Sequence, residues 1–215
     1  VRSLLAKAAS LRDGPNEQMA KAWSRYYPFF LVLTYSGMRP GEAIGLPWKD
    51  VDFKRDTIKV TQDAGDDGSI GLPKSAAAYR TIHMPRFVML ELMKWELKCP
   101  ASEHGLVFPN WSGSVESHSN LTHRGWYSLL KGCGMMAKDG PPKSPLKSLR
   151  HVRASLEIHN GATAKELQVL MGHSSVQITF DVYGHLFKDH AESRAARANL
   201  IAEQLSARGK SVARV

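Results

Sequence analysis

Cysteine is scarce in this sequence. Only Cys99 and Cys133 occur among 215 residues, and neither stands near a second cysteine or a histidine at the spacing of a metal site. This composition argues against a disulfide scaffold and a zinc site, and it fits a reducing, cytoplasmic environment.

Long apolar segments are also missing. The longest apolar run, PFFLVLTY, has eight residues, whereas a membrane-spanning helix needs about 20. The first residues do not have the pattern of a signal peptide. We therefore expect a protein with no membrane partner.

Negative charge is in deficit. The chain has 29 Lys and Arg against 20 Asp and Glu, so its net charge is +9. An excess of this size favours an anionic partner, and nucleic acid is the commonest one. The alternative is a basic surface that serves only solubility. Hydrophobic residues make up 43% of the chain, which is enough for a buried core.

The hydrophobic pattern predicts a mainly α-helical domain with one small antiparallel β-sheet, an α+β fold. Alternating residues in DTIKVTQ and YRTIHMP predict two strands, and VDF is a candidate third strand. Pro28 is expected to interrupt the helical pattern near the N-terminus. The expected helices cover 16–27, 28–36, 40–46, 86–97, 119–134, 146–161, 163–172, 174–183 and 187–207.

The segment SGMRPGEAIGL places Arg39 between a helix stop at Gly37 and a helix start at Pro40. Free backbone N–H groups at a helix start attract anions, so Arg39 stands in a natural anion-binding position. Glu42, in the first helical turn, could orient Arg39. The alternative is an ordinary surface ion pair, which contributes little.

Two further segments carry basic residues that could contact a phosphate. Lys74 precedes a predicted strand and could reach a ligand from a hairpin turn. Lys147 and Arg150 lie three residues apart on a predicted helix and therefore share a face, with Arg153 near it. Arginine binds phosphate oxygens through two parallel hydrogen bonds, although a solvated helix face remains the alternative.

The segment MGHSSVQITFDVYGHL contains a histidine and a tyrosine ten residues apart. Gly172 is a typical residue to end the preceding helix, which would place His173 in a tight corner. Ser174 and Gln177 fit a capping box for the next helix. Tyr183 would lie just beyond that helix, where Gly184 frees the backbone. Each alone is more typical of a helix cap or of packing, and we expect Ile178 and Phe180 to belong to the core.

Taken in order, these segments resemble the tyrosine recombinase family, the phage-type integrases. The family pattern is an arginine in a G-x-R-x-x-E turn, a hairpin lysine, an H-x-x-R helix, a G-H corner and a tyrosine about ten residues later. Its counterparts here are GMRPGE, PKSAAAYRTI, LKSLRHVRAS, LMGHSS and DVYGHL, which lie between about Phe29 and Leu186. No single motif is specific, but five in this order are strong evidence.

The resemblance implies the catalytic-domain fold of DNA breaking-rejoining enzymes and the activity of a site-specific DNA recombinase or integrase. Such an enzyme cuts and rejoins double-stranded DNA through a 3′-phosphotyrosyl intermediate. By position, Arg39 and Arg150 would clamp the non-bridging oxygens of the scissile phosphate. Glu42 would support the site without taking part in the chemistry.

The remaining roles also follow from the resemblance. Lys74 would protonate the departing 5′-oxygen, His173 would donate a hydrogen bond to the phosphate, and Tyr183 would be the nucleophile. Phosphoryl transfer mainly needs positioning and neutralised charge, which these side chains can supply without a metal or a cofactor. The sequence accordingly has no carboxylate cluster for Mg²⁺ and no GxxxxGK[ST] nucleotide motif.

One position departs from the family pattern. Lys147 stands where the family usually has the first histidine of H-x-x-R, a residue that in many members accepts the proton of the tyrosine. A lysine is usually a cation at pH 7 and a poor base, so we interpret Lys147 as a phosphate ligand and leave the base open. We interpret His151, next to Arg150, as structural.

The resemblance also implies an organisation. Residues 1–15 would be a linker from an N-terminal core-binding domain, 16–186 the catalytic domain, and 187–215 a C-terminal helix with a basic tail. The expected assembly is a homotetramer on paired DNA sites, weakly associated or monomeric without DNA, in the cytoplasm with bacterial or phage DNA. The final helix would offer a stripe of small residues to a neighbouring protomer or to its own domain: Ala191, Ala195, Ala198, Ala202 and Leu205.

Two rival functions remain. A type IB-like topoisomerase would use similar chemistry and carries a lysine at the position of Lys147. A catalytically inactive DNA-binding protein on the same fold would explain Lys147 as a sign of decay.

Overall fold

The computed structural model describes residues 1–136, 144–187 and 198–205. The chain is mainly helical with small antiparallel sheets, so the predicted fold class is confirmed. The helices are α1 Arg2–Arg12, α2 Glu17–Ser36, α3 Pro40–Ile44, α4 Arg86–Glu96, α5 His118–Asn120, α6 Ser128–Gly132, α7 Ser148–His159, α8 Ala164–Met171 and α9 Val176–Tyr183. A π-helical segment, Leu121–Tyr127, joins α5 to α6, and short 3-10 turns cover Trp48–Asp50, Ala76–Ala78 and Gly184–Leu186. The strands are β1 Val51–Asp52, β2 Thr57–Val60, β3 Asp63–Ala64, β4 Ile70–Gly71 and β5 Arg80–His83.

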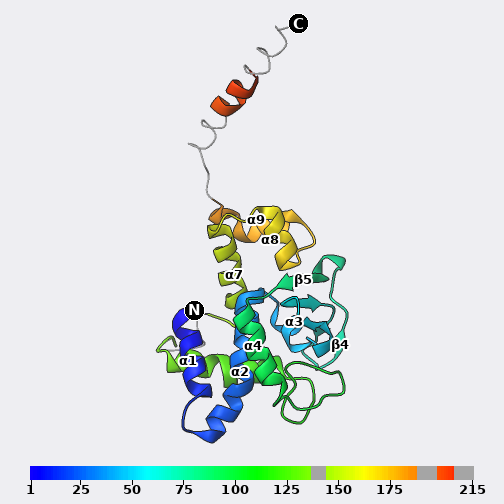
Figure 1. Cartoon of the computed structure of the whole chain (residues 1–215), viewed down its shortest axis with the longest axis vertical. Helices are drawn as coiled ribbons and strands as arrows, with labels where there is room; N and C mark the ends of the chain where they lie inside the picture. The colour runs from blue at the N-terminus through cyan, green and yellow to red at the C-terminus, as the bar shows by residue number, and fades with distance from the viewer. Residues whose placement is uncertain (137–143, 188–197, 206–215) are drawn as a thin grey trace.

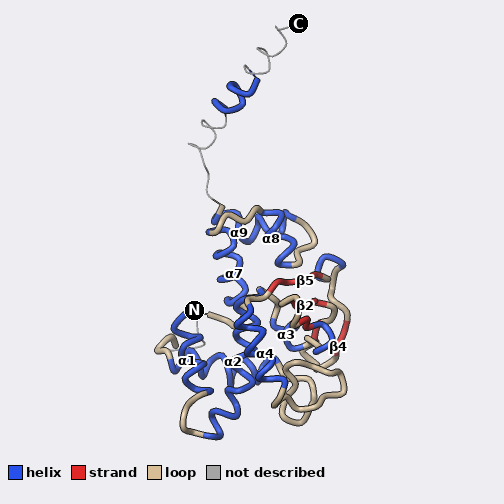
Figure 2. Tube along the Cα trace, viewed as in Figure 1, coloured by secondary structure: helices blue, strands red, loops and turns tan. Residues whose placement is uncertain are grey.

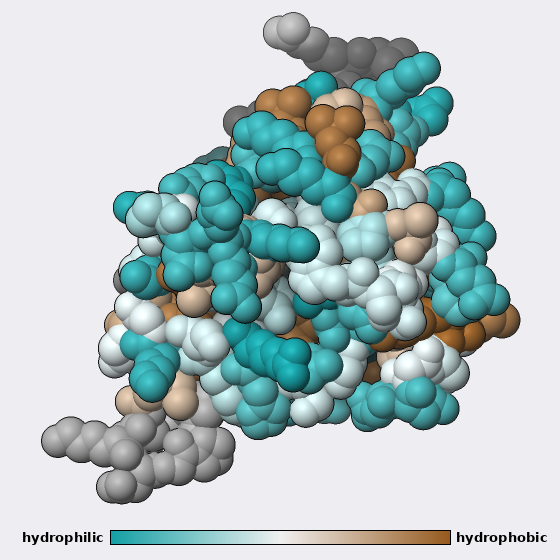
Figure 3. Space-filling model, turned by 90° about the horizontal axis from the view of Figure 1, so that it is seen from below, coloured by the Kyte–Doolittle hydropathy of each residue, from teal (hydrophilic) through white to brown (hydrophobic). Residues whose placement is uncertain are grey.

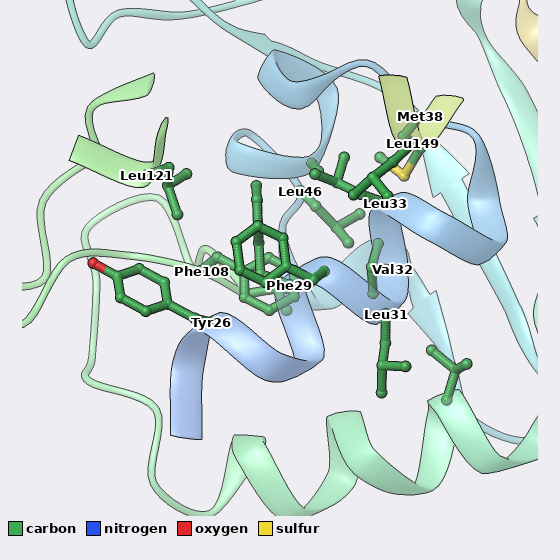
Figure 4. Packing of buried hydrophobic residues seen from close by; sticks show 14 of the residues in the cluster. Tyr26, Phe29, Leu31, Val32, Leu33, Met38, Leu46, Phe108, Leu121 and Leu149 are labelled. Carbon is green, nitrogen blue, oxygen red and sulfur yellow. The ribbon is translucent and has the colours of Figure 1, made fainter. Parts of the chain in front are cut away.

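Helix α2 is the centre of the core. It runs from Asn16, whose side chain accepts a hydrogen bond from the Met19 N–H, to Gly37, which adopts the left-handed conformation at φ 68°. The expected interruption at Pro28 was wrong, because α2 continues through it. Proline removes one helical hydrogen bond, but the apolar side chains on both sides of Pro28 are buried together and hold the helix in one piece (Figure 4).

The N-terminal segment predicted as a linker is structured. Residues 2–12 form α1, which packs on α2 and buries Leu4 and Ala8 in the core. The conformational entropy lost when this segment becomes ordered is therefore offset by the burial of its apolar side chains. Its role as a connection to a further domain stays a prediction.

The main sheet has three antiparallel strands in the order β1-β2-β5. Ile58 of β2 lies opposite Ile82 of β5, and both are buried in the core, whereas Lys59 and Thr81 face solvent. The predicted alternation is therefore confirmed. The segment expected to be only a turn forms a second, two-stranded sheet from β3 and β4. Figure 2 shows the strands gathered to one side of α2 and α4.

Helices α8 and α9 lie with the C-terminal part of α7 at one end of the molecule (Figure 1), and Leu149 near the start of α7 belongs to the main core. A small apolar cluster joins them through Ala154, Leu167, Met171 and Tyr183. The expectation that Ile178 and Phe180 belong to the core was wrong, because they are 37% and 46% exposed. Helix α9 has only two turns and buries Thr179 and Tyr183 instead, which leaves its other apolar side chains at the surface.

One face of the molecule is shown by hydropathy in Figure 3. The face in Figure 3 is mainly hydrophilic, and its apolar areas are small and separate. Within the described residues, no helix is both long and apolar enough to span a membrane. The predicted C-terminal helix lies largely outside the described residues: 198–205 are helical, while Ala191 and Ala195 fall outside them.

Candidate functional site

Arg39 and Glu42 lie together at the start of α3, as predicted. The Glu42 carboxylate accepts hydrogen bonds from the backbone N–H of Arg39 at 2.9 Å and from its Nη1 at 2.8 Å. Glu42 is buried, whereas the Arg39 side chain is 43% exposed. The carboxylate therefore holds one edge of a guanidinium that stays open to an anion.

A second arginine, Arg80 of β5, completes this network. Its Nη2 donates to Glu42 Oε2 at 2.7 Å, and its Nη1 donates to Glu42 Oε1 at 3.2 Å. Its Nε donates to the carbonyl of Leu170 in α8 at 2.8 Å. Burial opposes ionisation of Glu42, but the hydrogen bonds and charge of Arg80, with those of Arg39, hold its pKa below the ordinary value. Arg80 therefore ties the sheet, α3 and α8 to one carboxylate.

Lys74 lies at the exposed edge of a small cavity beside Arg39. The cavity measures about 110 Å³ and is lined by Arg39, Glu42, Asp63, Pro73, Lys74, Ser75 and Ala78. Burial, followed by the charge of Glu42, raises the pKa of Asp63, while Lys74 and Arg39 act in the opposite direction. The structure therefore places Lys74 in the same electrostatic environment as Arg39.

Arg150 of α7 is buried and connects two helix ends. Its Nη1 donates to the carbonyl of Gly37 at 2.6 Å, and its Nη2 donates to the carbonyl of Met171. Burial and the neighbouring charge of Arg39 lower the pKa of Arg150 to about 10, so the side chain remains a cation at pH 7. The end of α2 and the end of α8 thus meet at this guanidinium.

His173 lies in the predicted corner between α8 and α9. Gly172 ends α8 at φ 63°, a conformation that favours glycine. The N-cap of α9 is Ser175, which accepts from the Ile178 N–H, so the expected capping box of Ser174 and Gln177 was wrong. His173 Nδ1 lies 3.0 Å from the hydroxyl of the fully buried Thr179. Burial and the charges of nearby arginines lower the pKa of His173 to about 4, so its ring is neutral at pH 7.

Tyr183 is the last residue of α9 rather than the residue just beyond it, as was expected, and it is 3% exposed. Gly184 has φ −54°, so the expected freedom of the backbone there is not used. The Tyr183 ring lies nearly parallel to the His173 ring, at an interplanar angle of 13° and a centroid distance of 6.4 Å. Burial raises the pKa of the Tyr183 phenol, and the charge of Arg150 acts in the opposite direction.

The Tyr183 hydroxyl lies 3.0 Å from Nδ1 of His151 on α7. The sequence interpretation of His151 as structural therefore missed a direct contact with the phenol. Lys147 is the N-cap residue of α7, one turn before His151, and is exposed. Arg153 pairs with Glu157 at 2.5 Å on the same helix.

The structure thus brings together most of the residues singled out from the sequence. The charges of Arg150, Arg39 and Arg80 all act on His173, and that of Arg150 acts on Tyr183. Three residues were missed: His151, Thr179 and Arg80. The signal for Arg80 was visible in the strand alternation, which placed a charged side chain on the same face as the buried Ile82.

The site has the chemistry of an anion-binding centre. Arg39, Arg80 and Arg150 converge near one buried carboxylate, Glu42, so positive charge is in excess. Within residues 1–136, 144–187 and 198–205, no group of three or more His, Cys, Asp or Glu side chains is arranged to hold a metal ion.

Comparison of the sequence with known proteins identifies a family and several relatives. The sequence model described as the phage integrase family matches residues 4–190. A tyrosine recombinase XerC-like protein of Caldanaerobacter subterraneus is 26% identical over 186 residues, which are 75% of this chain and 46% of that protein. The transposase from transposon Tn916 of Enterococcus faecalis is 25% identical over 193 residues, which are 83% of this chain and 47% of the transposase. The chain therefore spans about half the length of these curated relatives.

Solved structures share the fold. The Tn1549 transposon integrase in complex with transposon right end DNA matches with a TM-score of 0.70 and 23% identity, over 95% of this chain and 63% of the integrase. The XerH site-specific recombinase bound to difH substrate matches with a TM-score of 0.68 and 19% identity, over 94% of this chain and 52% of the recombinase. These proteins and the relatives above give no support to the topoisomerase alternative.

Proposed function

This chain belongs to the phage integrase family, the tyrosine recombinases, and on that premise we propose that it cuts and rejoins double-stranded DNA with Tyr183 as the nucleophile. The observation that carries the proposal is the position of the phenol. The Tyr183 ring lies nearly parallel to the His173 ring, and the positive charge of Arg150 acts on the Tyr183 phenol. Under this proposal, the nucleophile and an excess of positive charge share one site.

The arginines would hold the scissile phosphate. Arg39 has an exposed guanidinium edge, and Arg150 is held rigidly by two backbone carbonyls. Preorganised donors of this kind stabilise the charge that develops in phosphoryl transfer without reorganising during the reaction. Glu42 would position Arg39, and Lys147 would add an exposed phosphate contact.

His173 and Lys74 would assist from the two sides of the phosphate. When the Thr179 hydroxyl donates to Nδ1 of His173, the ring carries its proton on Nε2 and can donate it to a phosphate oxygen. Lys74 lies at the edge of the cavity that Arg39 also lines. From there it would give a proton to the 5′-oxygen that leaves.

Assembly into a homotetramer on paired DNA sites belongs to the same proposal. The apolar residues Val176, Ile178, Phe180 and Val182 of α9 are exposed. A neighbouring cavity of about 460 Å³ is lined by Ile158, Leu186 and Phe187 among others. The C-terminal segment of a second copy, from residue 187 onward, would cover this surface and link the protomers. The protein would act in the bacterial cytoplasm, on bacterial or phage DNA.

The test uses nicked DNA duplexes tiled from the region that flanks the gene. A nick just beyond the cleavage site releases a short fragment, so the covalent intermediate accumulates. We expect a protein–DNA adduct that survives denaturation and maps to Tyr183 by mass spectrometry. The variant Tyr183→Phe should bind the same duplex with unchanged affinity and give no adduct. DNA binding by both proteins with no adduct from either would instead favour the inactive DNA-binding alternative.

A further inference from the structure

We propose that His151 is the proton acceptor for Tyr183. This inference rests on the proposed function and deepens it, because Lys147 stands where many family members have a histidine in that role. In the cleavage step, Nδ1 of His151 takes the phenol proton while the tyrosine oxygen attacks phosphorus.

The geometry supports a direct transfer. Nδ1 of His151 and the Tyr183 hydroxyl are 3.0 Å apart, which is within the range required of a general base and its substrate proton. The two ring centroids are 5.6 Å apart with an interplanar angle of 60°. The contact joins α7 to α9, so both groups are held by helices rather than by a loop.

The local charges favour the reactive protonation states. Partial desolvation of its ring lowers the pKa of His151, although the residue is exposed at the surface, and the charges of Lys147 and Arg150 lower the pKa further. The imidazole is therefore neutral at pH 7 and can accept a proton. The pKa of the Tyr183 phenol is raised by burial, so the nucleophile still carries the proton that must be removed. Among the described residues, the charged groups that face His151 are Lys147 and Arg150 from α7, and the titratable group from α9 is Tyr183.

The neighbouring side chains are less suited to this step. Nδ1 of His173 is already within hydrogen-bond distance of Thr179, and its ring stacks on the Tyr183 ring. A protonated lysine has three donors and no acceptor, so Lys147 in its usual form cannot take the phenol proton. His151 has a free nitrogen lone pair aimed at the hydroxyl when its own proton is on Nε2.

The step is balanced in both directions. In cleavage the tyrosine oxygen bonds to phosphorus, the bond from phosphorus to the 5′-oxygen breaks, and the 5′-oxygen receives a proton from Lys74. His151 is left as an imidazolium ion beside the phosphotyrosine. In rejoining, the 5′-hydroxyl attacks phosphorus and returns its proton to Lys74, and the departing phenolate recovers its proton from His151.

The first experiment measures single-turnover cleavage of the nicked duplex by His151→Gln. Glutamine can still accept a hydrogen bond from the phenol through its amide oxygen, but it cannot take the proton. We expect a fall of about 10²- to 10⁴-fold near pH 7, and a rate that then rises steadily with pH as Tyr183 ionises unaided. His123→Gln is the matched control, because His123 also packs against a tyrosine, Tyr127, outside the site. A His151→Gln enzyme with the wild-type rate and pH profile would show that His151 only positions the phenol.

A second experiment separates the base from the acid. A substrate with sulfur in place of the bridging 5′-oxygen has a leaving group that needs no proton. We expect this substrate to restore cleavage by Lys74→Ala and to leave the defect of His151→Gln unchanged. Restored cleavage by His151→Gln would place His151 at the leaving group and overturn the inference.

A third measurement needs no DNA. Nitrogen NMR of the free protein at pH 7 should show the His151 proton on Nε2, with an Nδ1 signal that changes in Tyr183→Phe. A proton on Nδ1 would contradict the inference. Thermal melting of each variant confirms that it is folded. If the wild-type protein forms no adduct, the proposed function itself fails, whereas adduct formation that is indifferent to His151 overturns only this inference.

Discussion

Arg80 and Glu42 form a two-point ion pair that is almost completely buried, with N–O distances of 2.7 and 3.2 Å and side chains only 3% and 2% exposed. The pair joins a strand to the helix that carries Arg39. Because a buried charge without its partner is costly, this pair couples the stability of the domain to the geometry of the site.

Removing one partner should therefore be severe. We expect Arg80→Met to lower the free energy of unfolding by about 3–5 kcal/mol, since the Glu42 carboxylate is left without its main counter-charge. The measurement is urea denaturation at pH 7. The double variant Glu42→Gln with Arg80→Met removes both charges and should recover part of the loss. An Arg80→Met protein as stable as the wild type would show that the pair has no structural role.

The hydroxyl of Thr179 should matter for the orientation of His173. Thr179→Val removes the group 3.0 Å from His173 Nδ1 while keeping a branched side chain. We expect single-turnover cleavage to slow by about tenfold, which corresponds to about 1.4 kcal/mol, with DNA affinity unchanged. Thr179→Ser keeps the hydroxyl and should remain close to the wild-type rate. Equal rates for the valine and serine variants would argue against this role.

The stability of the domain should fall with acid in the window set by His173. Its pKa is lowered to about 4 in the folded state, against about 6.5 when unfolded. The unfolded chain therefore binds a proton that the folded chain does not between these values, and stability is lost as the pH falls from 6.5 towards 4. Solvent screening reduces the full effect to about 1–2 kcal/mol. Denaturation curves from pH 7 to 4.5 should show a smaller loss for His173→Gln than for the wild type.

Gly172 should tolerate no side chain. Its φ of 63° is unfavourable for other residues, and a Cβ atom there would lie 2.8 Å from Nη1 of Arg80. We expect Gly172→Ala to cost about 1–2 kcal/mol for the backbone alone, and more because Arg80 must move. Gly134→Ala is the matched control, with φ 68° and no heavy atom of the described residues within 4 Å of the added Cβ. Equal destabilisation of the two variants would show that Arg80 adapts without loss.

The sequence predicted the elements whose signals are local. Glycine stops at Gly37 and Gly172 both adopt the left-handed conformation, and the strand alternation around Ile58 and Ile82 is confirmed. The order of the motifs was enough to identify the family. The glycine stops, the strand alternation and each single motif depend on residues within a few positions of one another, and the family follows from the order of the motifs along the chain.

Contacts between distant segments were beyond such reasoning. Arg80 and Glu42 are 38 positions apart, and Tyr183 and His151 are 32 apart, so no local pattern links them. Helical periodicity likewise predicted that Ile178 and Phe180 would be buried, but it cannot say whether another element covers that face. Pro28 was misjudged because tertiary packing on α2 outweighs its local preference.

The setting of Arg150 decides how an inert form of this protein should be made, for instance to capture DNA complexes for crystallography. Its guanidinium fastens the end of α2 to the end of α8 through two carbonyl oxygens. A replacement there would loosen the scaffold and remove the proposed phosphate contact together, so a loss of activity would have two explanations. Tyr183→Phe removes only the hydroxyl oxygen. Its hydrogen-bond partner, His151, lies at the surface, where a water molecule can take the place of the hydroxyl. Tyr183→Phe is therefore a better substitution than a change at Arg150 for making an inactive protein with an intact fold.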